Sequence, residues 1–144
     1  MRTHVIFRHP APFVAVSEED GVLSVDGSDW FVELLKRIEG LVVRAEPIQE
    51  DWGVAVAVER GGNAFWIGLS SWPEFDGAWL AHVHHGSFAW FQRFSATGKR
   101  EFRRLLSDLH RVLTAEPSVS HVTWYRERDM MKPNPQSHPT PDET

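Results

Sequence analysis

The sequence predicts an α+β domain in which an antiparallel meander sheet of five to seven strands carries two helices packed on one face. Two segments show the apolar spacing of three and four residues that is typical of an amphipathic helix. The stretch between them holds short extended runs joined by glycine-containing turns. Because these strands follow one another without intervening helices, we expect antiparallel hairpins rather than the alternating units of a parallel sheet.

Length and composition fit one packed domain. The chain has 144 residues, of which 42% are hydrophobic and 24% charged, values that are usual in globular proteins and unlike those of disordered chains. We predict a single α+β domain over residues 1–129. Residues 130–144 hold four of the nine prolines and show no apolar periodicity, so we predict a disordered, Pro-rich tail there.

Composition also excludes several classes of protein. The chain contains no cysteine, which excludes disulfides, thiolate catalysis and cysteine-ligated metals, and makes a reducing cytoplasm the expected location. No segment approaches the ~20 apolar residues of a membrane-spanning helix, so no membrane partner is expected. A net charge of −5 argues against a nucleic-acid partner, because binding to phosphates depends on clustered Lys and Arg.

The first part of the chain is predicted to form short strands and one helix. Residues 3–8 are β-rich and stop before Pro10, and residues 13–16 and 22–25 are expected to be extended as well. A helix is predicted to begin near Trp30, where apolar residues recur on one face, and to stop at Gly40.

The middle of the chain is predicted to form the meander. Residues 41–45 are a candidate strand, and residues 54–59 and 64–69 form a hairpin around a Gly-rich turn. Residues 79–85 and 88–94 form a second hairpin candidate. In the first hairpin, alternation directs Phe65, Ile67 and Leu69 to one face and Trp66 to the other, where it meets either a second core or solvent.

The last predicted elements are a helix over residues 99–113, with apolar residues at helical spacing, and a strand over residues 121–126. Seven tryptophans are distributed over the chain, well above ordinary usage. Trp30 is expected in the core, because it lies on the apolar stripe of the first helix. Trp52 and Trp72 lie in predicted loops and are the best candidates for surface anchors.

Two histidines form a candidate metal site. His82 and His84 are two residues apart on a predicted strand, so their side chains share one face and can share a metal such as zinc. A functional site needs a third ligand. The sequence offers these candidates without placing any of them: His121, Glu46, Glu50 and Asp51. Without a third ligand, the two imidazoles simply occupy an exposed sheet face.

Three carboxylates gather beside a tryptophan. Glu46, Glu50 and Asp51 precede Trp52 immediately before the first hairpin. Such a segment can blunt a sheet edge, and paired carboxylates can perform acid–base chemistry when burial separates their pKa values. We favour a partner-binding loop over catalysis, with Glu46, Glu50, Asp51, Trp52 and Trp72 as the contact residues.

A sequence pattern extends from this segment into both hairpins. Glu46-Pro47-x-x-Glu50-Asp51-Trp52-Gly53 is followed by Phe65-Trp66-Ile67-Gly68-Leu69 and then by Trp79-Leu80-x-x-Val83. Over about residues 41–94, the chain resembles small uncharacterised bacterial proteins of the toxin-immunity type. The resemblance implies a non-enzymatic cytoplasmic inhibitor that binds its cognate toxin, with an acidic loop covering a basic active site.

Three hypotheses for function follow. The leading one is a small cytoplasmic protein-binding module without a cofactor, of the immunity-inhibitor kind, whose partner is another protein. The alternative is a metal-dependent enzyme that uses His82 and His84 with a divalent metal such as zinc. A third is a homodimer joined through the exposed sheet faces, which would also account for aromatic residues on a sheet surface.

Overall fold

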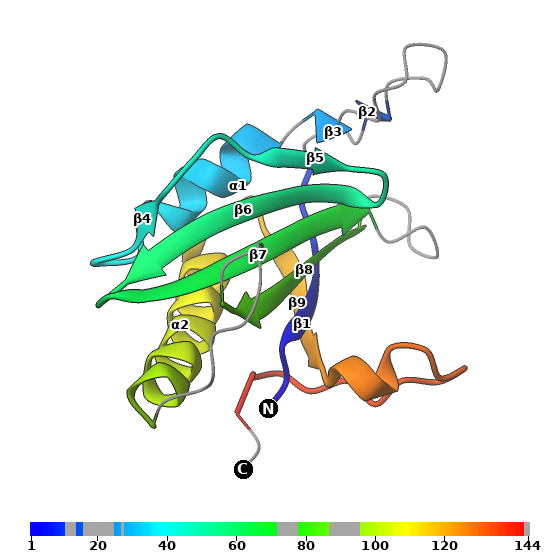
Figure 1. The fold of residues 1–144 in the computed structure, drawn as a ribbon. Coiled ribbons are helices and arrows are strands. Elements are labelled where there is room, and N and C mark those ends of the chain that lie inside the picture. Colours follow the sequence, from blue (N-terminus) through cyan, green and yellow to red (C-terminus); the bar gives the residue numbers. More distant parts are fainter. Residues whose placement is uncertain (11–13, 16–24, 27, 72–77, 87–95, 143–144) are drawn as a thin grey trace.

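The computed structural model describes residues 1–10, 14–15, 25–26, 28–71, 78–86 and 96–142. It confirms the predicted fold class: a seven-stranded antiparallel sheet that does not close into a barrel, with two helices on one face (Figure 1). The strands of this sheet are β1 (His4–Arg8), β4 (Val42–Val43), β5 (Ile48–Glu50), β6 (Gly53–Arg60), β7 (Asn63–Ser71), β8 (Ala78–His85) and β9 (Ser120–Tyr125). The helices are α1 (Ser28–Leu35) and α2 (Ala96–Ala115), and a separate two-stranded sheet pairs β2 (Val14–Ala15) with β3 (Val25–Asp26).

The strand order is β4-β6-β7-β8-β1-β9, and β5 pairs with β6 next to β4. The predicted first hairpin is confirmed as β6 and β7, which face each other in the register Val56↔Ile67. Gly61 and Gly62 have φ values of 56° and 77°, the left-handed pair that a tight two-residue hairpin turn requires. The predicted strand at residues 88–94 lies outside the described residues.

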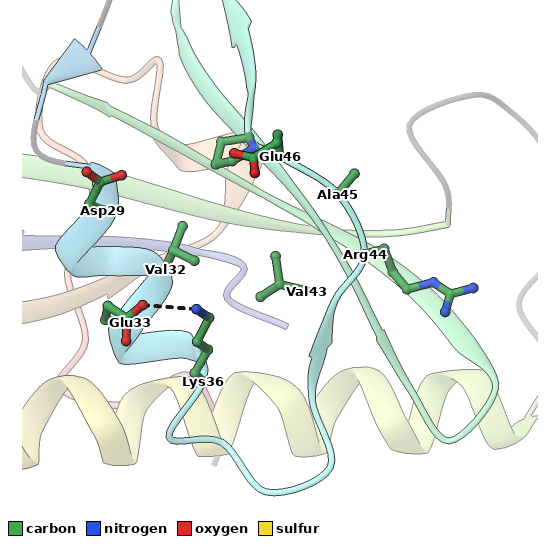
Figure 2. Close-up of a pocket in the computed structure, with 9 residues that line it drawn as sticks. Asp29, Val32, Glu33, Lys36, Val43, Arg44, Ala45 and Glu46 are labelled. Atoms are coloured by element: carbon green, nitrogen blue, oxygen red, sulfur yellow. Dashed lines mark hydrogen bonds and ion pairs between the residues drawn. The ribbon is translucent and has the colours of Figure 1, made fainter.

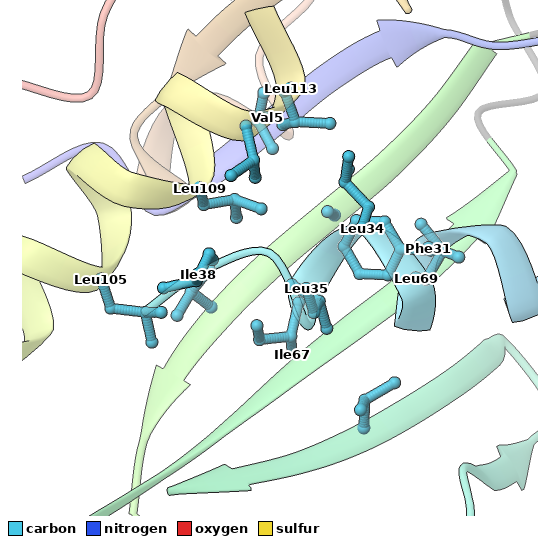
Figure 3. Packing of buried hydrophobic residues seen from close by; sticks show 14 of the residues in the cluster. Val5, Phe31, Leu34, Leu35, Ile38, Ile67, Leu69, Leu105, Leu109 and Leu113 are labelled. Carbon is cyan, nitrogen blue, oxygen red and sulfur yellow. The ribbon is translucent and has the colours of Figure 1, made fainter. Parts of the chain in front are cut away.

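The core lies between the sheet and the two helices (Figure 3). Alternate residues of β7 face the helices, where Ile67 and Leu69 are fully buried. Leu35 of α1 and Leu105 of α2 pack into the same cluster. Burying a side chain of this size contributes roughly 1.5–3 kcal/mol, so the helix side of the sheet supplies most of the stability.

Two features of α1 differ in detail from the prediction. The helix ends at Leu35, because the N–H groups of Arg37 and Ile38 donate to carbonyls three residues back and tighten the last turn. Gly40, the predicted stop, lies beyond the end of the α-helix and has a φ of 78°. Trp30, predicted in the core, is half-buried: it packs against the core and stacks on His9 with ring centroids 3.8 Å apart.

The C-terminal segment runs beside the outer edge of β9. The N–H of Trp124 donates to the carbonyl of His138 at 2.7 Å, and the N–H of His138 donates back at 2.9 Å. The guanidinium of Arg2 donates to the carbonyls of Thr140 and Asp142. The disorder predicted for residues 130–144 stays a prediction, which amide hydrogen exchange can test. Among the described residues, no helix is long and apolar enough to cross a membrane.

Candidate functional site

The face of the sheet that the helices leave uncovered carries a cluster of histidines and tryptophans. Because strand residues alternate, the burial of Val5 and Val83 on the helix side turns His4 and His84 to the opposite face. The register then places His4 opposite His82 on adjacent strands. We call the set of His4, Trp52, Trp66, His82 and His84 the His–Trp cluster.

Ring stacking fixes the positions of the imidazoles. His84 lies flat on Trp66, with ring centroids 3.9 Å apart and an interplanar angle of 10°. His4 stacks on His82 at 5.5 Å. The Nδ1 atom of His82 lies 2.7 Å from Nε2 of His84, close enough for one neutral ring to donate its N–H to the other.

A glycine makes room for the central imidazole. Gly68 pairs with His82 across β7 and β8, and the ring of His82 lies directly over its backbone. A Cβ atom at Gly68 would be 2.2 Å from Cε1 and 2.3 Å from Nε2 of His82. The glycine is therefore required for the close approach of this ring to the sheet.

Burial keeps the cluster uncharged. It lowers the pKa of His4 to about 4 and, with help from the two neighbouring histidines, lowers the pKa of His82 to about 3. Burial also lowers the pKa of His84. The carboxylate of Glu127 opposes this effect at His4 and His84 without reversing it. At neutral pH the three imidazoles are neutral, so each keeps one nitrogen lone pair.

The structure brings the predicted metal pair together without completing a metal site. Within the described ranges, no group of three or more His, Asp or Glu side chains is arranged to hold a metal ion. His4, which was not among the suggested third ligands, is the residue that joins the pair. Of the suggested ligands, His121 is exposed on β9 and its Nδ1 lies 3.0 Å from the hydroxyl of Ser120.

A second feature is the segment of residues 42–52 at one side of the sheet, which we call the sheet margin. Val42, Ile48 and Trp52 are 53%, 44% and 40% exposed, although each is a large apolar residue. Val42 pairs with Glu59 and Ile48 with Ala55, which places both on the uncovered face. The only other exposed large hydrophobic residues in the described part of the chain are Met1 and Met131.

Trp52 connects the sheet margin to the His–Trp cluster. Its ring lies 6.3 Å from that of Trp66 and 5.1 Å from that of His82, measured between centroids. The predicted acidic loop is in part a strand, because Glu50 ends β5, and Asp51 and Trp52 form the turn into β6. Glu50 and Asp51 therefore lie next to the exposed apolar side chains on the same segment of chain.

Glu46 lines a pocket on the opposite, helix side of the sheet margin. The pocket has a volume of about 620 Å³ and separates α1 from the chain between β4 and β5 (Figure 2). Val32 and Val43 point toward each other across it, and Asp29 and Glu46 lie at one end (Figure 2). Arg44 extends away from the pocket.

The predicted contact residues are thus divided. Glu50, Asp51 and Trp52 adjoin one another in the sheet margin, and Trp72 lies outside the described residues. Val42 and Ile48 were not predicted as contact residues, because neither has a charged neighbour in the sequence and no local pattern shows that these apolar side chains are exposed. Asp29 was not predicted either, because its place in the same pocket as Glu46 depends on long-range packing.

Comparisons with known proteins identify no relative. The sequence matches no protein-family model, and neither the curated proteins nor the solved structures contain a match.

Proposed function

We propose that this protein is a protein-binding module and that the sheet margin is its contact surface. The observation that carries the proposal is the exposure of Val42, Ile48 and Trp52 on one face of the same short segment. Apolar side chains of this size contribute roughly 1.5–3 kcal/mol each when a partner removes them from water. A surface of this kind is stabilised by association with another molecule.

Trp52 has the properties of a binding hot spot. Tryptophan is enriched among the residues that dominate binding energy, particularly where its ring is held in place before binding. Contacts with Trp66 and His82 restrict the Trp52 ring while leaving 40% of the residue exposed. A partner that covers it would gain apolar contact at a small cost in conformational entropy.

Charge indicates the kind of partner. Glu46, Glu50 and Asp51 contribute three negative charges to the sheet margin, and its one basic residue, Arg44, forms an ion pair with Glu59 at 2.9 Å. Acidic residues around an apolar contact accelerate association with a basic surface and disfavour acidic partners. We propose, as the finer assignment, an immunity-type inhibitor that covers the basic active site of a toxin, in agreement with the sequence resemblance.

The test is quantitative affinity enrichment from lysate of the source cells with wild-type protein, Trp52→Ala and Ile48→Thr. Met131→Ala serves as the matched control, because Met131 is 92% exposed and lies outside the sheet margin. We expect one or more proteins to be recovered by wild type and the control but depleted at least tenfold by both margin variants. Recovery of the same proteins by all four forms, or of no protein, would contradict the proposal.

A second candidate function, a metal-dependent enzyme, is favoured by the position of the neutral His82 and His84 rings beside each other on one face of β8, with His4 opposite His82 on β1. Neutral imidazoles are the form that binds zinc. Elemental analysis of untagged protein tests this candidate. Stoichiometric metal that disappears in the His82→Ala, His84→Ala double variant would support it, and metal-free protein after growth with added zinc would reject it.

A further inference from the structure

We propose that the sheet margin binds its partner as an added β-strand, and that this strand presents basic side chains to the helix side and apolar side chains to the uncovered side. This inference rests on the proposed function and specifies the chemistry of the partner. It follows from three properties of the margin: its free outer edge, the different chemistry of its two sides, and its charge.

The outer edge of the sheet margin is free of pairing in the described part of the chain. β4 and β5 both pair with the side of β6 that β7 leaves open, and no described strand pairs with their other side. At the far end of the sheet, by contrast, His138 forms a bridge to Trp124 of β9. An unpaired edge presents backbone N–H and C=O groups, and an extended peptide can satisfy them by adding a strand.

The two sides of this edge differ in chemistry. On the uncovered side lie the exposed side chains of Val42 and Ile48. On the helix side lies the pocket with Asp29 and Glu46 (Figure 2). Successive residues of a strand point to opposite faces, so a strand added here would send every second side chain toward the pocket and the others over Val42 and Ile48.

The pocket fits a basic side chain. Lys36 forms an ion pair with Glu33 at 2.9 Å, which neutralises both groups. Asp29 and Glu46 have no ion pair with any described residue, so two carboxylates at one end of the pocket remain for a cation. Val32 and Val43 provide apolar contact for the methylene stem of Lys or Arg, in the way that long basic side chains cover apolar surface.

The same charges disfavour a second copy of this chain as the added strand. Two margins paired with each other would bring Glu46, Glu50 and Asp51 of both copies together, and like charges across a pair of strands are destabilising. Pro47 has no N–H to offer and restricts self-pairing further. Carboxylates and proline at an edge reject an identical acidic edge while still accepting a basic strand.

Peptide binding tests the inference. The probe is a nine-residue peptide with blocked termini, in which arginine alternates with valine. Its binding is measured by fluorescence anisotropy at moderate salt. The first control has the same composition with the arginines and valines in separate blocks. The second has methyl groups on alternate backbone nitrogens, which removes the donors that a strand needs. We expect the alternating peptide to bind at least tenfold more tightly than either control.

Protein variants locate the contact. The Asp29→Asn, Glu46→Gln double variant removes both charges without changing shape, and we expect it to weaken binding of the alternating peptide at least tenfold. Glu39→Gln is the matched control, because Glu39 is exposed and does not line the pocket. Hydrogen exchange should show new protection of the amides of residues 48–50 in the complex. Near-ultraviolet circular dichroism confirms that each variant is folded.

The outcomes separate this inference from the function on which it rests. Equal binding of the alternating and block peptides, or binding unaffected by the double variant, would overturn the added strand. If the recovery of lysate proteins still depends on Trp52 in that case, the protein-binding function stands, and only binding by an added strand is rejected. A dimer detected by light scattering and dispersed by Ile48→Thr would overturn the inference in favour of a second copy.

Discussion

At the scale of single residues, the uncovered face of the sheet depends on one close approach. Gly68 leaves the space that the ring of His82 occupies, and His82 in turn lies within reach of His84 and Trp52. Gly68 therefore determines the position of His82 and, through the contacts of His82, that of the His–Trp cluster. Its effect is steric, because Gly68 is absent from the residues with positive φ.

The first prediction concerns this contact. Gly68→Ala should lower the free energy of unfolding by about 1–3 kcal/mol, the usual cost of forcing extra volume into a packed site. In a His82→Ala background the same change should cost much less, since the ring that the new Cβ meets is gone. Urea unfolding of the four proteins measures the coupling. An equal cost in both backgrounds would show that the ring does not lie on the glycine.

The second prediction concerns protonation. The lowered pKa values of His4 and His82 mean that the folded state binds these protons less readily than the unfolded state. The free energy of unfolding is therefore not reduced by these histidines above their ordinary pKa of 6.5, and it falls as the pH drops toward about 4. For each histidine that stays neutral in the folded state, the free energy of unfolding falls by up to about 1.4 kcal/mol per pH unit as the pH drops through this range.

Urea unfolding of metal-free protein between pH 7 and pH 4.5 measures this dependence. The interval avoids most of the titration of Glu116 and Asp129, whose pKa values are lowered by hydrogen bonds from Arg37 and Lys132 respectively. His82→Gln removes one titrating group and should flatten the curve. A stability that is constant over this interval would contradict the buried, neutral state of the cluster.

At the scale of elements, a buried ion pair joins the sheet to α2. Arg60 of β6 is 5% exposed and lies 2.7 Å from a carboxylate oxygen of Asp108 and 3.6 Å from one of Glu101, both on α2. The guanidinium is on the core side of the strand, where an unpaired charge would be costly. It fixes the position of the helix along the strand as well as contributing to stability.

The third prediction follows from this arrangement. Arg60→Ala should lower the free energy of unfolding by about 2–3 kcal/mol, somewhat less than for a fully buried pair, because both carboxylates can still reach water. Arg104→Ala is the control, since Arg104 is exposed and lies 3.8 Å from Glu101. We expect it to cost less than about 1 kcal/mol. If chemical denaturation shows similar losses of unfolding free energy in the two variants, the burial of Arg60 does not increase its contribution to stability.

Elements also show how far the sequence can predict this fold. Alternation in residues 54–59 and 64–69 predicted the β6–β7 hairpin, and the direction of Trp66, because both are consequences of local spacing. The segment before β6 was predicted as a loop, whereas Ile48 to Glu50 form a strand. Three residues next to a proline carry too little periodicity to reveal a strand, and only pairing with β6 creates it.

The site is less predictable than the elements. His82 and His84 could be placed on one face from their spacing alone. His4 could not be placed beside them, because the insertion of β1 between β8 and β9 is a long-range pairing with no local signal. The same holds for Asp29 and Glu46, which line one pocket only because α1 packs against the sheet.

At the scale of the whole molecule, the two faces and the two edges of the sheet have different roles. One face is covered by helices and supplies the core, and the other carries the His–Trp cluster. One edge is bridged by the C-terminal segment, and the other is the sheet margin. The edge whose backbone groups are paired by the C-terminal segment thus lies opposite the proposed contact surface.

The fourth prediction concerns the C-terminal segment. If it holds the edge of β9, the amides of Trp124 and His138 should exchange slowly, since each donates to the other residue's carbonyl. Removing residues 133–144 should expose the amide of Trp124 to exchange while leaving β6 and β7 protected. Rapid exchange at His138 in the full-length protein would instead support the disordered tail predicted from composition.

Trp52 is the central residue of the proposed contact surface, because it is exposed and its ring is held by Trp66 and His82. Once a partner is in hand from affinity enrichment, calorimetric titration of wild type, Trp52→Ala and Met131→Ala measures the contribution of this side chain. We predict that Trp52→Ala raises Kd at least about 30-fold, the effect of a hot spot worth ~2 kcal/mol, while Met131→Ala leaves Kd unchanged. An unchanged Kd for Trp52→Ala would contradict the assignment of the sheet margin as the binding surface.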